Sequence, residues 1–452
     1  MKNTTAFRFS ARASVAALAL GTALFYAQPG TTYPLDADTA GISRLQGHKP
    51  EVAAKGGVRQ PPGALLSSAD IQLHLQGTAG ADWDIRDGNR SPQLQRALEA
   101  MFKERDPSYG VVVVDITDPE AIAWAAVREN FSQMPGSVGK ILTMLGFLSE
   151  LARAFPEPDE RRRLLREHTV VAGEWVKWDE HKVPRYDAES NTIHKASIAP
   201  GDRFTLAEWI DHMVAASANS AAATVWKETV LLRHFGSDYP PSAEQEEQFF
   251  RDTPRNKLWQ LASQAVSEPM LAAGLDPDRF WVGSFWTRSA KNLIPGNGNS
   301  RATPVAMARY LLRLEQGRLV DEWTSVEIKK YLYTTSRRYR YVYPGELRNA
   351  AVFFKSGSFY KCRPEPGFAC AKYAGNVDNL MNSIAIVESP AQAGEQQKRY
   401  IVALMSNVLR KNSAWDHARI GAAVEAMIQT RAAATIVEEG SAEAIRGAGG
   451  QD

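Results

Sequence analysis

Apolar segments typical of buried strands occur in two groups, near the two ends of the chain. Residues 109–116 and 122–127 form the first group, joined by a short turn. Residues 137–319, between the groups, show mainly helical periodicity. This order predicts an α/β (α+β) sandwich, in which one antiparallel β-sheet of distant segments is flanked by helices and carries an inserted all-α lobe. We expect functional residues where the two lobes meet. The second group of strand segments comprises residues 351–358, 383–387 and 399–405.

Two S-x-x-K motifs occur near these elements, and helix geometry separates them. Residues three apart share one face of a helix but point to opposite faces of a strand. Ser137 and Lys140 begin a segment whose apolar residues follow the i, i+3, i+4, i+7 pattern of a helix packed on a core. Ser358 and Lys361 instead lie at the end of the strand segment 351–358. The sequence therefore predicts that Ser137, and not Ser358, acts together with a lysine.

Two further motifs follow the first along the chain. Residues 217–219 read Ser-Ala-Asn, and residues 355–357 read Lys-Ser-Gly. The order and the residue types resemble the β-lactamase and penicillin-binding superfamily, whose signatures are S-x-x-K, S-D-N or a relative, and K-T-G. Ala218 replaces the aspartate of the second signature, and Ser356 replaces the threonine of the third. The hydroxyl and amide groups of the signatures are retained.

The resemblance extends beyond the three motifs. Residues 128–141 are similar to the family's strand-to-helix entry, and residues 219–226 to the helix after the second motif. Residues 294–304 are similar to the exit from the omega loop of class A β-lactamases. The similar segments span about residues 91–428. The resemblance implies an active-site serine hydrolase, closest in layout to class A enzymes, that acts on an amide or β-lactam through an acyl-enzyme.

The resemblance also assigns catalytic roles to the motif residues. Ser137 is the implied nucleophile, and its place at a helix start favours developing negative charge. Lys140 is the implied base. At the ordinary lysine pKa of about 10.4, about four molecules in ten thousand would be neutral at pH 7. Burial and a second cation must therefore lower this pKa, and we expect Lys355 to supply that charge. Ser217 would relay a proton to the leaving nitrogen, and Asn219 would hold Lys140 and the substrate amide.

The remaining implied site residues bind the substrate. The N–H groups of Ser137 and Ser358 would form the oxyanion hole, so the Ser358 side chain would be replaceable. Ser356 and Gly357 belong to the third motif, which would line the substrate. Arg340 stands in a run of arginines and tyrosines before this strand. This run is either a solvated turn or the place where Arg340 binds the substrate's carboxylate.

One class A feature is absent. Class A enzymes carry an omega-loop glutamate, in an E-x-x-x-N pattern, that activates the deacylating water. Counting back from Ile294 places Thr287 and Lys291 at these two positions, and neither side chain can replace the original. A displaced base, such as Glu174 or Glu180, is the alternative, although no motif supports it. We therefore expect slow deacylation.

The N-terminus resembles an export signal. Three cations precede an apolar stretch at residues 13–27, which is short for a bilayer span. Residues 1–27 are therefore expected to be a signal peptide or an N-terminal anchor. The protein would be periplasmic or secreted, or anchored to the inner membrane.

The expected domain organisation follows from these features. A linker is expected at residues 28–66, the hydrolase domain at 67–436 and a disordered tail at 437–452. Within that domain, the helical lobe would span about residues 137–344. The α/β lobe would comprise about residues 91–136 and 345–430.

The two cysteines, Cys362 and Cys370, predict one disulfide in an exported protein, with two unpaired thiols as the alternative. The eight histidines and two cysteines show no ligand spacing typical of a metal site, and we expect no cofactor. A net charge of +2 requires no nucleic-acid partner. The expected partner is a small-molecule or peptidoglycan-like substrate, and the sequence does not indicate an oligomeric state.

Several functions fit the motifs. Besides a β-lactamase, the chain could be a D,D-peptidase-like or esterase-like relative with slow deacylation. The rival from another class is a non-catalytic sensor domain that binds β-lactams or peptidoglycan. The complete set of motif side chains argues against that rival.

Overall fold

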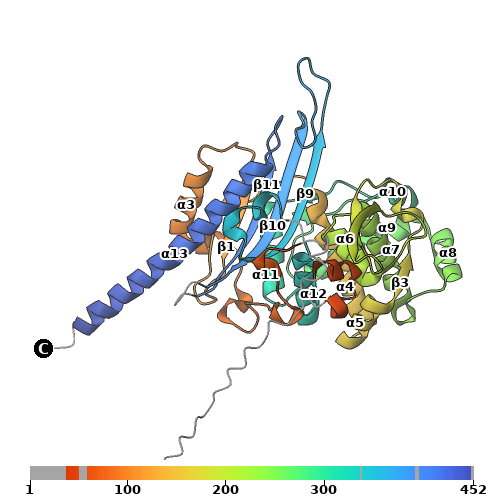
Figure 1. Ribbon diagram of the computed structural model, residues 1–452, viewed down its shortest axis with the longest axis horizontal. Helices are drawn as coiled ribbons and strands as arrows, with labels where there is room; N and C mark the ends of the chain where they lie inside the picture. Colours follow the sequence, from red (N-terminus) through yellow and green to blue (C-terminus); the bar gives the residue numbers. More distant parts are fainter. Residues whose placement is uncertain (1–36, 50–58, 336–337, 392–395, 449–452) are drawn as a thin grey trace, which may run out of the picture. The chain divides into compact units, whose positions relative to one another are not determined.

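A five-stranded antiparallel sheet is the central element of the chain (Figure 1). The computed structural model describes residues 37–49, 59–335, 338–391 and 396–448. The strand order β2-β1-β11-β10-β9 joins the two groups of strands, as predicted from the sequence. The strands are β1 Gly110–Asp115, β2 Ala123–Val127, β9 Ala351–Lys361, β10 Asp378–Ser389 and β11 Lys398–Asn407.

Residue choice explains why β1 occupies an interior position in the sheet, between β2 and β11. Its sequence, Gly-Val-Val-Val-Val-Asp, is rich in β-branched residues, and every residue is buried. Alternate valines point to opposite faces, so Val111 and Val113 join one apolar core while Val112 and Val114 join another. Pairing of β1 with β11 connects residues almost 300 positions apart along the chain. The sheet therefore has a packed core on each face.

Helices cover both faces of the sheet (Figure 1). Apolar residues of α3 and α13 join the core of one face, and those of α11 and α12 join the core of the other. The remaining longer helices form the lobe inserted between β2 and β9. The expected lobe, about residues 137–344, also included α11 and α12, which pack on the sheet instead. The α-helices are α1 Ala37–Ala40, α3 Pro92–Phe102, α4 Lys140–Ala154, α5 Pro158–Glu167, α6 Leu206–Val214, α7 Asn219–Phe235, α8 Ala243–Asp252, α9 Arg255–Ala272, α10 Arg288–Leu293, α11 Pro304–Glu315, α12 Glu322–Tyr333 and α13 Ala414–Ala448.

The inserted lobe also contains short strands and 3-10 turns that the sequence analysis did not predict. Three two-stranded sheets pair β3 Thr169–Val171 with β6 Arg203–Thr205, β4 Lys182–Asp187 with β5 Thr192–Ser197, and β7 Phe280–Trp281 with β8 Arg301–Ala302. The 3-10 turns of the chain are η1 Ser43–His48, η2 Pro62–Ala64, η3 Ser68–Asp70, η4 Ala79–Asp82, η5 Asp87–Asn89, η6 Gly136–Gly139, η7 Glu174–Val176, η8 Gly236–Asp238, η9 Arg340–Val342 and η10 Gly345–Leu347.

The segments expected as a linker and as a disordered tail both contain helical turns in the structure. The expected linker at 28–66 contains η1, where Arg44 forms a buried two-point ion pair with Asp211 of α6 at 2.6 Å. This ion pair anchors η1 on the helical lobe. In the structure α13 extends to Ala448, into the segment expected as a tail at 437–452. The alanine-rich sequence after Arg431 favours helix over disorder. Residues 1–27, the expected export segment, lie outside the described residues.

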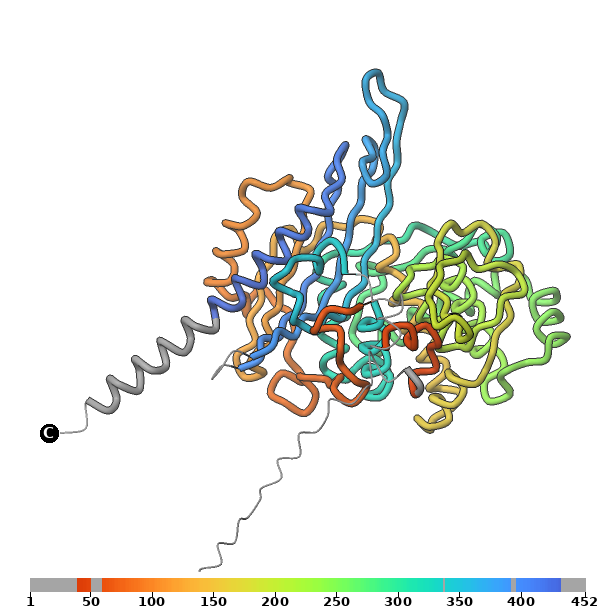
Figure 2. The backbone as a smooth tube through the Cα atoms, in the orientation of Figure 1, coloured from red at the N-terminus to blue at the C-terminus, as the bar shows by residue number. Residues whose placement is uncertain are grey.

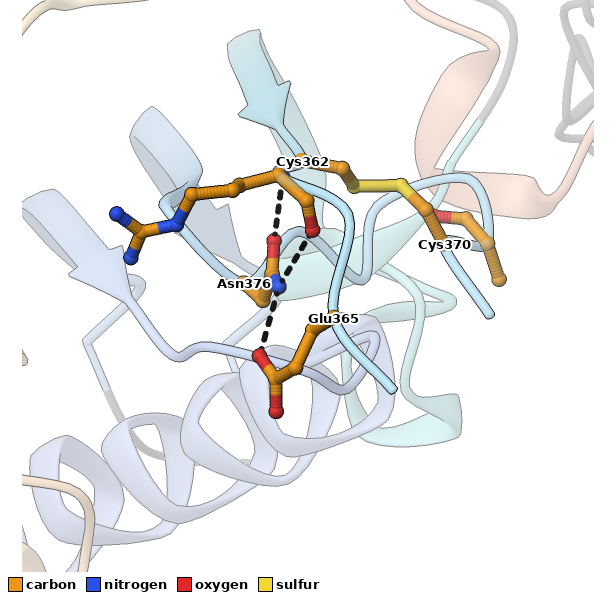
Figure 3. The surroundings of a disulfide bond; sticks show 6 residues. Cys362, Glu365, Cys370 and Asn376 are labelled. Atoms are coloured by element: carbon orange, nitrogen blue, oxygen red, sulfur yellow. Dashed lines mark hydrogen bonds between the residues drawn. A yellow bond between two sulfur atoms is a disulfide. The ribbon is translucent and has the colours of Figure 1, made fainter. Parts of the chain in front are cut away.

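The hairpin of β9 and β10 runs past the ends of the neighbouring strands (Figure 2). Its connection carries the disulfide between Cys362 and Cys370, so that prediction is confirmed. Figure 3 shows how Asn376 braces this loop. Its amide donates to the Arg363 carbonyl and to Glu365 at 3.0 Å, and its carbonyl accepts the Arg363 N–H at 2.8 Å. The disulfide and the amide together order the turn.

Among the described residues, no helix combines the length and apolar character that crossing a membrane requires.

Candidate active site

Ser137 and Lys140 lie one turn apart where η6 leads into α4. The sequence analysis placed Ser137 at a helix start, and in the structure that start is a 3-10 turn. The Lys140 ammonium donates to Ser137 Oγ at 2.8 Å. Lys140 is 0% exposed. Burial lowers its pKa to about 7, against an opposing effect of the Asp179 charge. A large neutral fraction at pH 7 gives Lys140 the capacity to accept a proton from Ser137.

Two glycines allow η6 to approach strand β9 closely. A Cβ on Gly357 would lie 2.2 Å from the Pro135 carbonyl oxygen and 2.8 Å from the Ser137 nitrogen. A Cβ on Gly136, which has a φ of +55°, would lie 2.8 Å from the Ser358 nitrogen. Only residues without a side chain fit this contact. The close approach brings the backbone N–H groups of Ser137 and Ser358 to the same region, as an oxyanion hole needs.

The loop before α7 brings Ser217 and Asn219 to Lys140. The Lys140 ammonium donates to the Ser217 carbonyl at 3.0 Å and to Asn219 Oδ1 at 2.8 Å. Ser217 has a φ of +62°, which is uncommon for a residue with a side chain. Such backbone strain clusters at functional sites. In this conformation its carbonyl faces Lys140 while its hydroxyl meets a second lysine.

Lys355 of β9 is that second lysine. Its ammonium donates to Ser217 Oγ at 2.8 Å and to the Ser356 carbonyl at 3.0 Å. Burial, together with the charges of Lys140 and Arg340, lowers the pKa of Lys355 well below its usual range. Because both lysines contact Ser217, protonation of one disfavours protonation of the other. Lys355, and not Lys140, contacts the Ser217 hydroxyl, so Lys355 is placed to exchange a proton with it.

Arg340 is buried beside the third motif, so the solvated-turn interpretation is wrong for this residue. Its guanidinium donates to the Gly357 carbonyl at 3.2 Å. The rings of Tyr339 and Tyr373 each lie 5.2 Å from it. The Tyr339 hydroxyl also forms a short hydrogen bond with the Ser356 hydroxyl. Arg340 therefore braces the strand at Gly357, and its contact with a substrate carboxylate stays a prediction.

Thr287 stands at the position where the sequence resemblance would place a water-activating glutamate. Thr287 is 1% exposed and caps α10, and its hydroxyl donates to the Trp175 carbonyl at 2.7 Å. The preceding Trp286 places its ring 4.6 Å from the Lys140 ammonium and donates its indole N–H to Thr143 at 3.1 Å. An aromatic face therefore covers the lysine. The Glu174 side chain is 65% exposed and pairs with Lys177, so it does not suit the displaced-base role.

Two residues at the site were missed by the sequence analysis. Asp179 lies in the insertion before β4 and accepts hydrogen bonds from Ser220, the neighbour of Asn219. Trp286 precedes the position examined for the missing glutamate. Neither residue belongs to a motif. Asp179 lies in an insertion without hydrophobic periodicity, so the sequence does not indicate which residues it contacts. Trp286 offered one signal, its place directly before Thr287 in the similar segment.

Within the residues that the structure describes, His, Cys, Asp and Glu side chains form no group of three or more suited to a metal ion. The polar groups gathered at the site are two lysines, two serines and an asparagine. These groups suit nucleophilic attack and proton transfer.

Comparison with known proteins adds a likeness of fold. No protein-family model matches the chain, and no curated protein matches it. A solved PBP-A mutant in acyl-enzyme complex with penicillin G is 12% identical, with a TM-score of 0.46, over 76% of this chain and 100% of that one. TLA-3 extended-spectrum β-lactamase is 14% identical, with a TM-score of 0.46, over 74% and 97%. A β-lactamase from Chitinophaga pinensis DSM 2588 is 14% identical, with a TM-score of 0.44, over 76% and 100%. At these identities the likeness concerns the fold and not the reaction.

Proposed function

We propose that the protein is an exported serine hydrolase of the β-lactamase and penicillin-binding superfamily, which forms an acyl-enzyme at Ser137 with an amide or β-lactam substrate. The observation that carries the proposal is the contact between the Lys140 ammonium and Ser137 Oγ at 2.8 Å. A fully buried lysine with a pKa of about 7 is matched to accepting the serine proton near neutral pH. An ordinary surface lysine would remain protonated there.

The proposed acylation begins when Ser137 Oγ attacks the substrate carbonyl and its proton passes to Lys140. The N–H groups of Ser137 and Ser358 stabilise the negative charge on the carbonyl oxygen. The carbon–nitrogen bond then breaks, and Ser217 donates a proton to the leaving nitrogen. Ser217 takes a proton in turn from Lys355, whose ammonium donates to its hydroxyl. Asn219 holds Lys140 during these steps. The product is an ester of Ser137, which water must hydrolyse to complete turnover.

We expect slow hydrolysis of this ester, which would favour a penicillin-binding or peptidase-like function over a fast β-lactamase. Thr287 has its hydroxyl engaged with the Trp175 carbonyl, so it is not free to orient a water. General-base assistance typically contributes about 100- to 10,000-fold to a rate. A site that acylates normally but lacks this assistance holds its acyl-enzyme for correspondingly longer. An esterase-like relative and a sensor domain that reports acylation share this expectation.

Mass spectrometry of the purified protein mixed with a penicillin tests the proposal. We expect one adduct per chain, mapped to Ser137 and persistent, and a reporter cephalosporin should show a stoichiometric burst followed by slow turnover. Ser137→Ala is the matched control and should take up no adduct. Fast steady turnover without a trapped adduct would show that another residue activates water, which favours the β-lactamase reading. No adduct with any acylating probe would refute the acyl-enzyme.

A further inference from the structure

The first turn of α7 carries Asn219 into the site. The N-cap residue of α7 offers no side-chain acceptor to stabilise that turn. Ala218 is the N-cap, and its methyl group accepts no hydrogen bond. The first N–H groups of an α-helix have no partner within the helix. A Ser, Thr, Asp or Asn at the N-cap usually accepts one of them, at a value of about 1 kcal/mol. The turn therefore takes its acceptor from elsewhere in the chain.

Asp179, between η7 and β4, supplies that acceptor from 41 positions upstream. Its Oδ2 accepts the backbone N–H of Ser220 at 2.8 Å and the Ser220 hydroxyl at 2.9 Å. Its Oδ1 accepts the His181 Nδ1–H at 2.6 Å and the His181 backbone N–H at 3.2 Å. The Asp179 side chain is 3% exposed. The carboxylate is thus enclosed and holds the end of α7 next to Asn219.

The same contacts exclude Asp179 as the base that activates a deacylating water. Burial acts to raise its pKa, but the hydrogen bonds from His181 and Ser220 act more strongly and bring it well below the usual range. A carboxylate held in its charged form by four donors is a weak proton acceptor. Its contribution must come through the groups that it holds.

The negative charge of Asp179 also acts on Lys140. It raises the pKa of Lys140, opposing the larger effect of burial. The charged groups that act on the pKa of Lys355 are the cations Lys140 and Arg340. His181 donates to the far oxygen of Asp179 and is 38% exposed. Asp179 therefore supplies a negative charge that opposes the effect of burial on Lys140.

We infer that Asp179 is a positioning residue for acylation: by capping α7 from a distant segment, it holds Asn219 against Lys140 and replaces the polar cap that Ala218 lacks. The inference rests on the proposed function and deepens it, because it adds a residue outside the three motifs. Asp179 touches neither Ser137 nor Lys140 through a hydrogen bond, and it acts through Ser220 and Asn219.

Three variants of the full-length protein separate this role from simple stabilisation. Asp179→Asn removes the charge and one acceptor while keeping the shape. Asp187→Asn is the matched control, since Asp187 lies in the same insertion and accepts backbone N–H groups of Glu189 and Ser190, but is half-buried and accepts no hydrogen bond from α7. Ser220→Ala removes one hydrogen bond and keeps the charge.

Two measurements compare the variants. The first is acylation by penicillin, followed by mass spectrometry across pH. The second is hydrogen exchange of peptides that span residues 219–223. In Asp179→Asn we expect acylation to slow roughly 10- to 100-fold. The pH midpoint of acylation should move to lower pH, because loss of the negative charge lowers the pKa of Lys140 further. The backbone amides in the first turn of α7 should exchange faster. Ser220→Ala should slow acylation less and leave the midpoint in place. Asp187→Asn should match the unmodified protein in all three respects.

Other outcomes overturn specific parts of the inference. If Asp179→Asn acylates at the ordinary rate and midpoint, Asp179 positions nothing. If only exchange and melting temperature change, Asp179 is a structural cap and the positioning role is wrong. If Asp179→Asn does not fold, an unaltered acylation rate in Ser220→Ala contradicts the inference. Lack of any adduct in the unmodified protein would contradict the proposed function instead. Hydrogen exchange would still decide whether Asp179 caps α7.

Discussion

The ammonium group of Lys140 lies 4.6 Å from the centre of the ring of Trp286, the residue directly before Thr287. This relationship combines two opposing effects. The ring face attracts a cation by about 0.5–2 kcal/mol. Burial disfavours the cation more strongly, because lowering the pKa from 10.5 to about 7 corresponds to roughly 5 kcal/mol. The net result is a lysine with a large neutral fraction at neutral pH.

Trp286→Ala should therefore shift the pH midpoint of acylation upward. Removing the ring admits water to Lys140, which raises its pKa toward the ordinary value, and the lost cation–π attraction is too small to reverse this. Acylation followed by mass spectrometry at several pH values measures the shift. Trp286→Phe, which keeps a ring but loses the hydrogen bond to Thr143, should stay close to the unmodified midpoint. A downward shift in Trp286→Ala would mean that the cation–π contact dominates.

Ser137→Ala should abolish covalent labelling by a serine-reactive probe, whereas Ser358→Ala should leave most of it. Ser137 receives the Lys140 hydrogen bond, while Ser358 is expected to contribute only its backbone N–H. Labelling is quantified from intact mass. The reverse pattern would identify Ser358 and Lys361 as the operative pair.

Lys140→Met should slow acylation by about 100- to 10,000-fold, the usual contribution of a general base. In the unmodified protein, the rate should rise as pH increases through about 7, because Lys140 loses its proton there and becomes able to accept one. Lys361→Met, which alters the lysine of the other S-x-x-K motif at an exposed position, is the control. Equal loss of rate in both variants would contradict the assignment.

Thr287→Glu should lower the melting temperature and should not accelerate deacylation. The Thr287 hydroxyl is buried against the Trp175 carbonyl, so a carboxylate there would lack donors and would be costly to bury. Thr287→Ser, which keeps the hydroxyl, should retain the ordinary melting temperature. Decay of the acyl-enzyme mass and a thermal melt are measured together. Faster decay in Thr287→Glu would show that this segment can place a base near the ester.

Replacement of both Cys362 and Cys370 by serine should lower the free energy of unfolding by about 2.5 kcal/mol, the chain-entropy value for so short a loop. The hydrogen bonds of Asn376 remain, so the hairpin should keep its connection. Urea denaturation measures the change. Thiol labelling of denatured, unreduced protein should find no free thiol, and two free thiols in exported material would contradict the disulfide.

Much of the fold and the motif set could be predicted because both depend on local patterns. Apolar runs rich in β-branched residues indicated the strands, and helical spacing separated Ser137 from Ser358. The insertion around Asp179 and the segment at η1 gave no such signal. Arg44 in η1 is ordered by a buried ion pair with Asp211, a residue far away in sequence. Composition alone therefore indicated a linker where tertiary contacts produce order.

The sequence by itself determined which chemical groups are available, in which order, and that Ser137 and Lys140 share one helical turn. Only the tertiary structure decided the environment of those groups. The pKa of Lys140 depends on burial and on the charge of Asp179. The groups around Lys140, which include Trp286, Ser217 and Asn219, come from separate segments of the chain. Electrostatic and burial effects act through space, so they exist only once these segments are packed together.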